Sequence, residues 1–120
     1  MKRSVVAVLA VAIIGATTIA LRLHAQEPQS RVVTISAKRF EFIPNEITLK
    51  RGEPVAIRVS AVDRDHGLYQ KDLKIELDLS PDHISEVIIT PEKAGRFVAI
   101  CDHFCGSGHG NMKMVINVVE

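Results

Sequence analysis

The chain has 120 residues, of which 47% are hydrophobic, with no Trp and one Tyr, and this length allows one domain with one core. Its formal net charge of +1 excludes the strongly basic composition typical of nucleic-acid-binding proteins. We therefore expect no nucleic acid among its partners.

Residues 1–25 have the outline of an export signal. Lys2 and Arg3 supply positive charge, and residues 4–21 then run without any charge. This uncharged run is as long as either a signal-peptide core or a minimal spanning helix, so the segment is a signal peptide cleaved after Ala25 or a single membrane anchor helix. In both cases the positive N-terminus stays in the cytoplasm. We predict that the rest of the chain is exported, in the periplasm or on the outer face of the cytoplasmic membrane, and touches the membrane only if the anchor is retained.

Beyond this segment the charge stays close to neutral. Without residues 1–25 the chain has 12 Lys and Arg against 14 Asp and Glu, a formal charge of −2. Residues 26–30 are polar and contain Pro28, which is typical of a linker. We expect one folded domain over residues 31–120.

Alternation of apolar and polar residues with a period of two dominates this domain. It is clearest over residues 33–37, 55–59 and 75–79. Shorter candidate strands are residues 46–50, 86–90, 97–101 and 113–119. Turn-forming Pro and Gly residues separate these segments, and no stretch has a sustained helical period. The pattern predicts an all-β fold, an antiparallel Greek-key β-sandwich.

Both cysteines lie in one loop between the last two predicted strands. The order is Cys101, Cys105, His109 and Met112, with the spacing Cys-x3-Cys-x3-His-x2-Met. Two thiolates, an imidazole and a thioether form a soft ligand set that favours copper, whereas calcium or magnesium would need several oxygen ligands. The three glycines of the loop let the backbone turn tightly enough for these side chains to converge. The spacing predicts a metal site.

A second imidazole is needed to complete such a site, and His66 is the candidate. It follows the predicted strand over residues 55–59. In a β-sandwich the segment there can emerge at the same end as the loop over residues 101–112. We therefore expect ligands from two distant parts of the chain.

Three other uses of these residues remain open. In an oxidising compartment Cys101 and Cys105 could form a structural disulfide. A zinc site could use both thiols with two histidines. A mononuclear blue-copper site would leave Cys101 as a buried bystander and use the other four candidates, His66, Cys105, His109 and Met112. The second thiol at this spacing favours two metal ions over one.

The loop resembles that of the cupredoxins. Within them it is similar to the dinuclear CuA domain of cytochrome c oxidase subunit II and nitrous oxide reductase, whose loop has the pattern Cys-x-Glu-x-Cys-x3-His-x2-Met. The resemblance covers roughly residues 32–119. It implies a cupredoxin-like sandwich in which Cys101 and Cys105 bridge two copper ions.

The resemblance also implies the remaining ligands. One copper would be bound by His109 and the main-chain oxygen of His103, and the other by His66 and the sulfur of Met112. His103 stands where the family usually has Glu. Because the family uses the main-chain oxygen at this position, the substitution need not abolish the site, but it can change the potential or offer an extra nitrogen ligand.

The function implied by this resemblance is transfer of single electrons, with a c-type cytochrome or an oxidase as redox partner. Oxidase subunit II typically has two spanning segments and accepts electrons through an aromatic cluster that includes Trp. This chain has at most one predicted span and no Trp, so we expect a stand-alone or accessory protein, with the electron-entry component of a cytochrome c oxidase-like complex as an alternative. Copper storage or delivery, and redox or metal sensing, are alternatives. We identify no general acid, base or substrate pocket that would make the chain an enzyme by itself.

Overall fold

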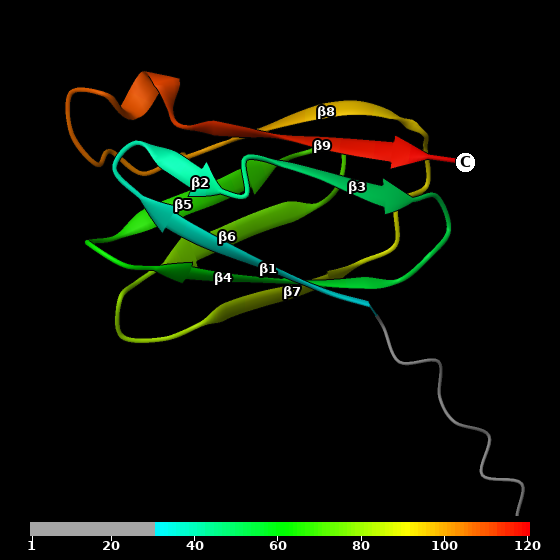
Figure 1. Ribbon diagram of the computed structural model, residues 1–120, viewed down its shortest axis with the longest axis horizontal. Helices are drawn as coiled ribbons and strands as arrows, with labels where there is room; N and C mark the ends of the chain where they lie inside the picture. Colours follow the sequence, from blue (N-terminus) through cyan, green and yellow to red (C-terminus); the bar gives the residue numbers. More distant parts are fainter. Residues whose placement is uncertain (1–30) are drawn as a thin grey trace, which may run out of the picture.

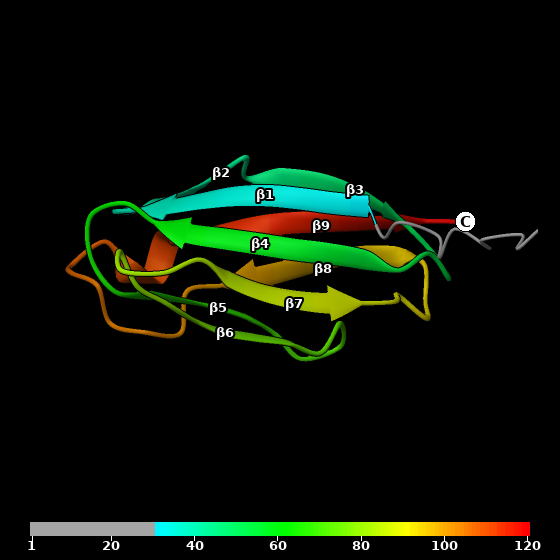
Figure 2. The same ribbon diagram turned by 90° about the horizontal axis from the view of Figure 1, so that it is seen from below.

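The computed structural model describes residues 31–120, which form two β-sheets packed against each other (Figure 1, Figure 2). The predicted signal or anchor and the linker, residues 1–30, lie outside the described residues. Within residues 31–120 no helix is long and apolar enough to cross a membrane.

The described residues form nine strands and one short 3-10 helix, η1. Their bounds are β1 Arg31–Lys38, β2 Glu41–Ile43, β3 Glu46–Lys50, β4 Val55–Ala61, β5 His66–Gln70, β6 Ile75–Leu79, β7 Ser85–Ile89, β8 Gly95–Ile100, η1 His109–Asn111 and β9 Lys113–Val119. One sheet has the strand order β2-β1-β4-β7, and the other has the order β3-β9-β8-β5-β6.

The predicted all-β sandwich is confirmed, but its sheets are mixed rather than wholly antiparallel. β1 pairs with β4 in parallel, and β3 pairs with β9 in parallel. The other pairs are antiparallel. The chain passes from one sheet to the other and back between β1 and β4, so these two strands become neighbours without a hairpin and run in the same direction.

Two strands were not predicted from the alternation pattern. β2 has three residues, which is too short for a periodic signal. β5 has the sequence His-Gly-Leu-Tyr-Gln and its first three residues are all buried, so apolar and polar residues do not alternate along it. The consequence for function is that His66 is the first residue of a strand and does not lie in a loop.

The core lies between the sheets and continues to one end of the sandwich. Its fully buried aliphatic residues include Ile35, Ile57, Leu68 and Ile116. Burial of each such side chain contributes roughly 1.5–3 kcal/mol relative to leaving it exposed. The same buried cluster includes Cys105 and Met112 of the loop between β8 and β9. That loop is therefore anchored in the core.

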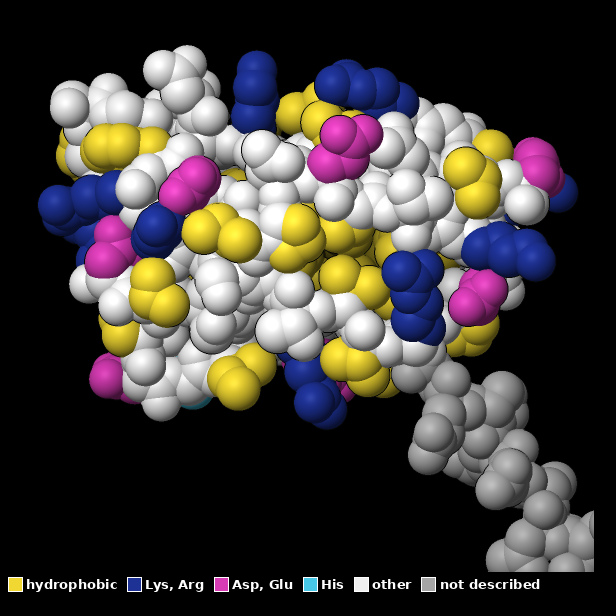
Figure 3. All heavy atoms as spheres, viewed as in Figure 1, with side chains coloured by type: hydrophobic (Ala, Val, Ile, Leu, Met, Phe, Trp, Pro, Cys, Tyr) yellow, Lys and Arg dark blue, Asp and Glu magenta, His cyan; other side chains and the backbone are white. Residues whose placement is uncertain are grey.

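The surface carries charges of both signs. On the face in Figure 3, Lys and Arg side chains are interspersed with Asp and Glu around hydrophobic ones. Exposed ion pairs such as Lys38–Glu41, at 3.2 Å, contribute little to stability because solvent screens them. The fold therefore depends on its core and its strand ladders.

Candidate metal centre

All six predicted ligand residues lie at one end of the sandwich. β5 begins there with His66. The loop between β8 and β9 supplies the other five, Cys101, His103, Cys105, His109 and Met112. The loop returns to the sheet through a hydrogen bond in which the Cys101 N–H donates to the Met112 carbonyl, at 3.0 Å. Two segments that are distant in sequence thus form one site.

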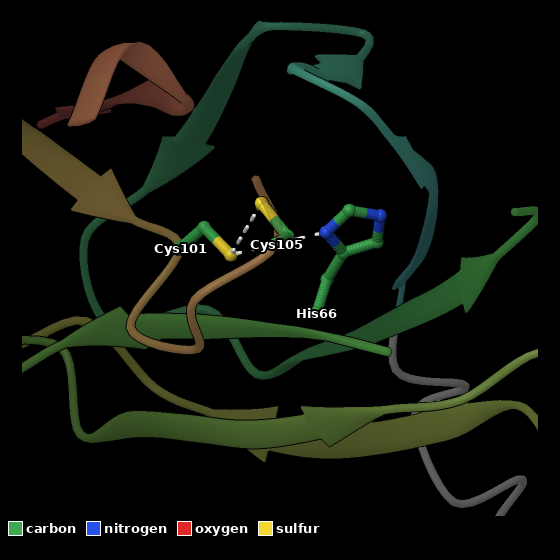
Figure 4. A group of neighbouring side chains, drawn as sticks. All are labelled: His66, Cys101 and Cys105. Atoms are coloured by element: carbon green, nitrogen blue, oxygen red, sulfur yellow. Dashed lines mark hydrogen bonds between the residues drawn. The ribbon is translucent and has the colours of Figure 1, made fainter. Parts of the chain in front are cut away.

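The two thiols face each other in the interior. Their Sγ atoms are 4.0 Å apart, whereas a disulfide bond is about 2.05 Å long. Both cysteines are free and buried, with exposed fractions of 3% for Cys101 and 0% for Cys105. Figure 4 shows the two sulfurs turned toward each other with the His66 ring beside them. Both thiols are therefore available to a metal ion between the sheets.

Each thiol has one imidazole as a neighbour. The Nδ1 atom of His66 lies 4.0 Å from Cys101 Sγ, and the Nδ1 atom of His109 lies 3.6 Å from Cys105 Sγ. Two ligand atoms bound tetrahedrally to one metal, at bond lengths of about 2.0–2.3 Å, lie roughly 3.3–3.8 Å apart. The ligand atoms of His66, Cys101 and Cys105 all lie within 4.8 Å of one another. The ligand atoms would therefore need to move only slightly closer together to bind the same metal ion.

Two weaker donors complete the arrangement. The Met112 sulfur is buried and lies 3.7 Å from Cys105 Sγ. The main-chain oxygen of His103 lies 3.2 Å from Cys101 Sγ. A thioether and a carbonyl oxygen are donors found in weak axial positions of copper sites.

The side chain of His103 points away from the thiols. Its Nε2 atom lies 3.1 Å from a carboxylate oxygen of Asp78 in β6. The imidazole therefore connects the loop to the edge of the sheet, and the atom that His103 directs at the thiols is its carbonyl oxygen.

Asp63 supports the imidazole of His66 and was not identified from the sequence. Its Oδ1 atom lies 2.7 Å from His66 Nε2, and its carboxylate accepts the main-chain N–H groups of Arg39 and Arg64, each at 2.9 Å. Because Nε2 faces Asp63, Nδ1 is the nitrogen directed at the thiols. Burial acts to raise the pKa of Asp63, but these hydrogen bonds and the imidazole outweigh it, so the pKa lies below its ordinary value. The Asp-x-x-His spacing was the available sequence signal.

Two adjacent buried thiolates are unfavourable without a cation. Burial raises the pKa of the Cys105 thiol, the neighbouring Cys101 raises it further, and Arg64 opposes these effects. A soft cation between the sulfurs would offset the repulsion and the loss of solvation. The donor set and its electrostatics therefore fit a bound copper.

Gly67 allows the ligand loop to lie against β5. A Cβ atom at this position would overlap Asp102 Oδ1 and His103 Nδ1. The side chains of Asp102 and His103 occupy the space that a side chain at residue 67 would need, next to His66. Like Asp63, Gly67 was missed by sequence reasoning, which considered side chains that donate to metals.

Comparisons with known proteins identify the family of the chain. The cupredoxin-like domain family matches residues 7–115 of the chain. Over 93 residues, 78% of the chain, it is 30% identical to two cytochrome c oxidase subunit 2 sequences of Thermus thermophilus, of which it spans 69% and 55% of the length.

The fold also matches a solved structure. The periplasmic domain of subunit II of cytochrome oxidase from Bradyrhizobium japonicum superimposes with a TM-score of 0.69 at 19% identity, covering 75% of this chain and 84% of that domain. At this identity the match concerns the fold alone. Together with the family match over most of its length and the similarity to the Thermus sequences, these findings mean that the chain belongs to the cupredoxin-like domain family and is related to subunit 2 of cytochrome c oxidase.

Proposed function

We propose that the chain is an exported copper protein that transfers single electrons through a dinuclear, CuA-like centre, and that it acts alone or as an accessory to a respiratory oxidase. One observation carries this proposal: two free, buried thiols lie 4.0 Å apart, and each has its own imidazole nitrogen within 4.0 Å. A mononuclear site needs only one of these thiols. The relation to oxidase subunit 2 supports copper as the metal.

In this proposal the six residues divide into bridging and terminal ligands. Cys101 and Cys105 would hold both metal ions. His109 and the carbonyl oxygen of His103 would bind one of them, and His66 and the sulfur of Met112 would bind the other. Copper supplies a one-electron couple when it is bound there.

The protein itself fixes the positions of these ligands and excludes water from them. His66 begins a central strand, and Met112 directly precedes β9, so neither lies in a freely moving segment. Four of the six ligand residues are buried, with exposed fractions of 0–3%, which excludes water from most of the donor atoms: His66, Cys101, Cys105 and Met112. Ligands that barely move between oxidation states favour fast electron transfer, whereas a protein that delivers copper needs ligands that a recipient can reach. Burial therefore favours the carrier over storage or delivery.

The redox partner in this proposal is a c-type cytochrome or an oxidase. Phe104 is 76% exposed, and its ring lies beside that of His109 with a centroid distance of 5.9 Å. An exposed aromatic side chain beside a ligand imidazole offers an apolar contact close to the centre. His66, both cysteines and Met112 stay buried beneath this surface.

Copper stoichiometry tests the dinuclear proposal. We expect the reduced, copper-loaded chain to retain two copper ions, and Cys101→Ser to lose at least one, since a bridging ligand is gone. Met114→Leu is the control, because Met114 is buried in the same core as Cys101 but lies within β9, outside the ligand loop. One copper per chain, retained by Cys101→Ser, would favour the blue-copper alternative.

A second measurement separates a carrier from a delivery protein. We expect slow loss of copper to a chelator and rapid electron exchange with a reduced c-type cytochrome. Rapid copper loss with negligible electron exchange would contradict the carrier.

A further inference from the structure

Arg39 contacts both halves of the metal centre although it is not among the six ligand residues. It lies between β1 and β2. Its main-chain N–H donates to Asp63 Oδ2 at 2.9 Å, and Asp63 in turn contacts His66. Its side-chain Nε–H donates to the main-chain oxygen of Cys105 at 3.1 Å. One residue therefore connects the strand that supplies an imidazole with the loop that supplies the thiols.

The loop needs such support at Cys105. Inside the turn that the Cys101–Met112 hydrogen bond closes, the first backbone carbonyl that accepts a hydrogen bond from a backbone N–H of the loop is that of Gly106, from the His109 N–H at 3.1 Å. Gly106 has a φ of +135°, a conformation that favours glycine and leaves the chain free to turn there. The carbonyl of Cys105 precedes this turn, and the guanidinium of Arg39 holds it from outside the loop.

The residue after Arg39 packs against the same loop. A Cβ atom at Gly108 would lie 2.6 Å from the ring of Phe40, and one at Gly106 would lie 3.1 Å from it. The ring therefore covers the turn that follows Cys105. The segment between β1 and β2 contacts the loop by packing and by a hydrogen bond at once.

We propose that Arg39 is a positioning residue of the metal centre, which holds the Cys105 thiol at a fixed separation from the His66 imidazole. The proposal rests on the proposed copper function. Without the side-chain donor, the hydrogen bond from the Arg39 main-chain N–H to Asp63 stays in place, so His66 keeps its position. The carbonyl of Cys105 loses its hydrogen bond, so Cys105 is held less firmly. A ligand that is held less firmly releases its metal more readily.

The test compares two arginines at opposite ends of β1. Arg39→Met keeps a long aliphatic side chain and removes the donor, whereas Arg39→Lys keeps a charged donor. Arg31→Met is the matched control, because Arg31 also donates to a main-chain oxygen, that of Thr48, at 3.0 Å. In the full copper-loaded chain, we expect Arg39→Met to release copper to a chelator about tenfold faster than the native chain. Arg39→Lys should recover part of the difference, and Arg31→Met should release copper at the native rate.

Spectroscopy and a copper-free measurement complete the design. The copper hyperfine splitting should change in Arg39→Met and not in Arg31→Met. In the reduced, metal-free chain carrying Cys101→Ser, we expect Arg39→Met to raise the alkylation rate of Cys105 severalfold above that of Arg31→Met, since the loop opens more often.

The outcomes separate the two proposals. Equal alkylation rates for the two variants would overturn the role of Arg39, and so would equal rates of copper release in a chain that binds copper. If the native chain retains no copper, the proposed function fails, and the alkylation rates alone then decide whether Arg39 positions the loop.

Discussion

The backbone of Gly67 lies directly against Asp102 and His103, and the carboxylate of Asp63 lies against the far nitrogen of His66. Neither residue donates to a metal, yet both determine where donors lie. Four candidate ligands were predicted from the sequence, because thiols, an imidazole and a thioether at close spacing are chemically distinctive: Cys101, Cys105, His109 and Met112. His66 was predicted as a second imidazole, and the His103 carbonyl came from the family resemblance. The supporting residues could not be predicted, because their roles depend on distances that only the folded chain defines.

The first prediction at this scale concerns Gly67. We expect Gly67→Ala to destabilise the fold by about 1–3 kcal/mol and to weaken copper binding, because the added methyl group would displace the side chains of Asp102 and His103 in the ligand loop. Gly110→Ala is the matched control within the loop, since a Cβ there meets nothing within 4 Å. Urea unfolding and competition with a copper chelator measure the two effects. Equal behaviour of the two variants would contradict the close approach.

The second concerns Asp63. Asp63→Asn removes the negative charge that faces His66 Nε2, so the imidazole is held less firmly. We expect copper affinity to fall roughly tenfold. Asp72→Asn, in the exposed turn between β5 and β6, should leave the affinity unchanged. An unchanged affinity in both variants would mean that the carboxylate does not orient the ring.

At the scale of elements, β5 and the loop after β8 contribute differently to the site. The alternation of apolar and polar residues predicted the strands that have one buried face. β5 has successive buried residues, so its sequence does not alternate and did not predict a strand. The parallel pairing of β1 with β4 was also beyond the pattern, because alternation indicates which face is buried and not which strand is the neighbour. His66 lies on a strand, while the other five candidate ligand residues lie on or beside a glycine-rich loop.

This difference predicts where copper changes hydrogen exchange. The loop between β8 and β9 is held by few backbone hydrogen bonds, whereas β8 and β9 form a continuous ladder over six residue pairs. We expect copper to slow exchange of amides in residues 102–111 at least tenfold and to leave the β8–β9 ladder nearly unchanged. If copper leaves the exchange rate of the loop amides unchanged, the loop is not a metal-binding element.

At the scale of the whole molecule, the centre and the core are one structure. Cys101, Cys105 and Met112 belong to the same buried cluster as the aliphatic residues between the sheets. Because a metal ion would connect β5 to the loop only in the native state, its binding energy adds to the stability of the fold. Because the two thiols are buried side by side, their ionisation at high pH destabilises the fold when no metal is bound.

The pKa of Cys105 predicts the direction of that pH dependence. Since this pKa is raised in the folded chain, the protonated thiol contributes stability that is present below the ordinary thiol pKa of about 8.5. The contribution is lost as the pH rises through the folded pKa. We therefore expect the free energy of unfolding of the reduced, metal-free chain to fall more steeply than that of Cys105→Ser as the pH rises from the ordinary thiol pKa toward the raised pKa of the folded chain. Parallel curves from urea unfolding at each pH would contradict the prediction.

The most direct test of the central claim is the electron paramagnetic resonance spectrum of the oxidised, copper-loaded chain. We expect one unpaired electron whose hyperfine splitting comes from two copper nuclei equally, because the thiolates of Cys101 and Cys105 would share the charge between both metals. Cys101→Ser should abolish that pattern. A spectrum with splitting from a single copper nucleus, unchanged by Cys101→Ser, would contradict the dinuclear centre.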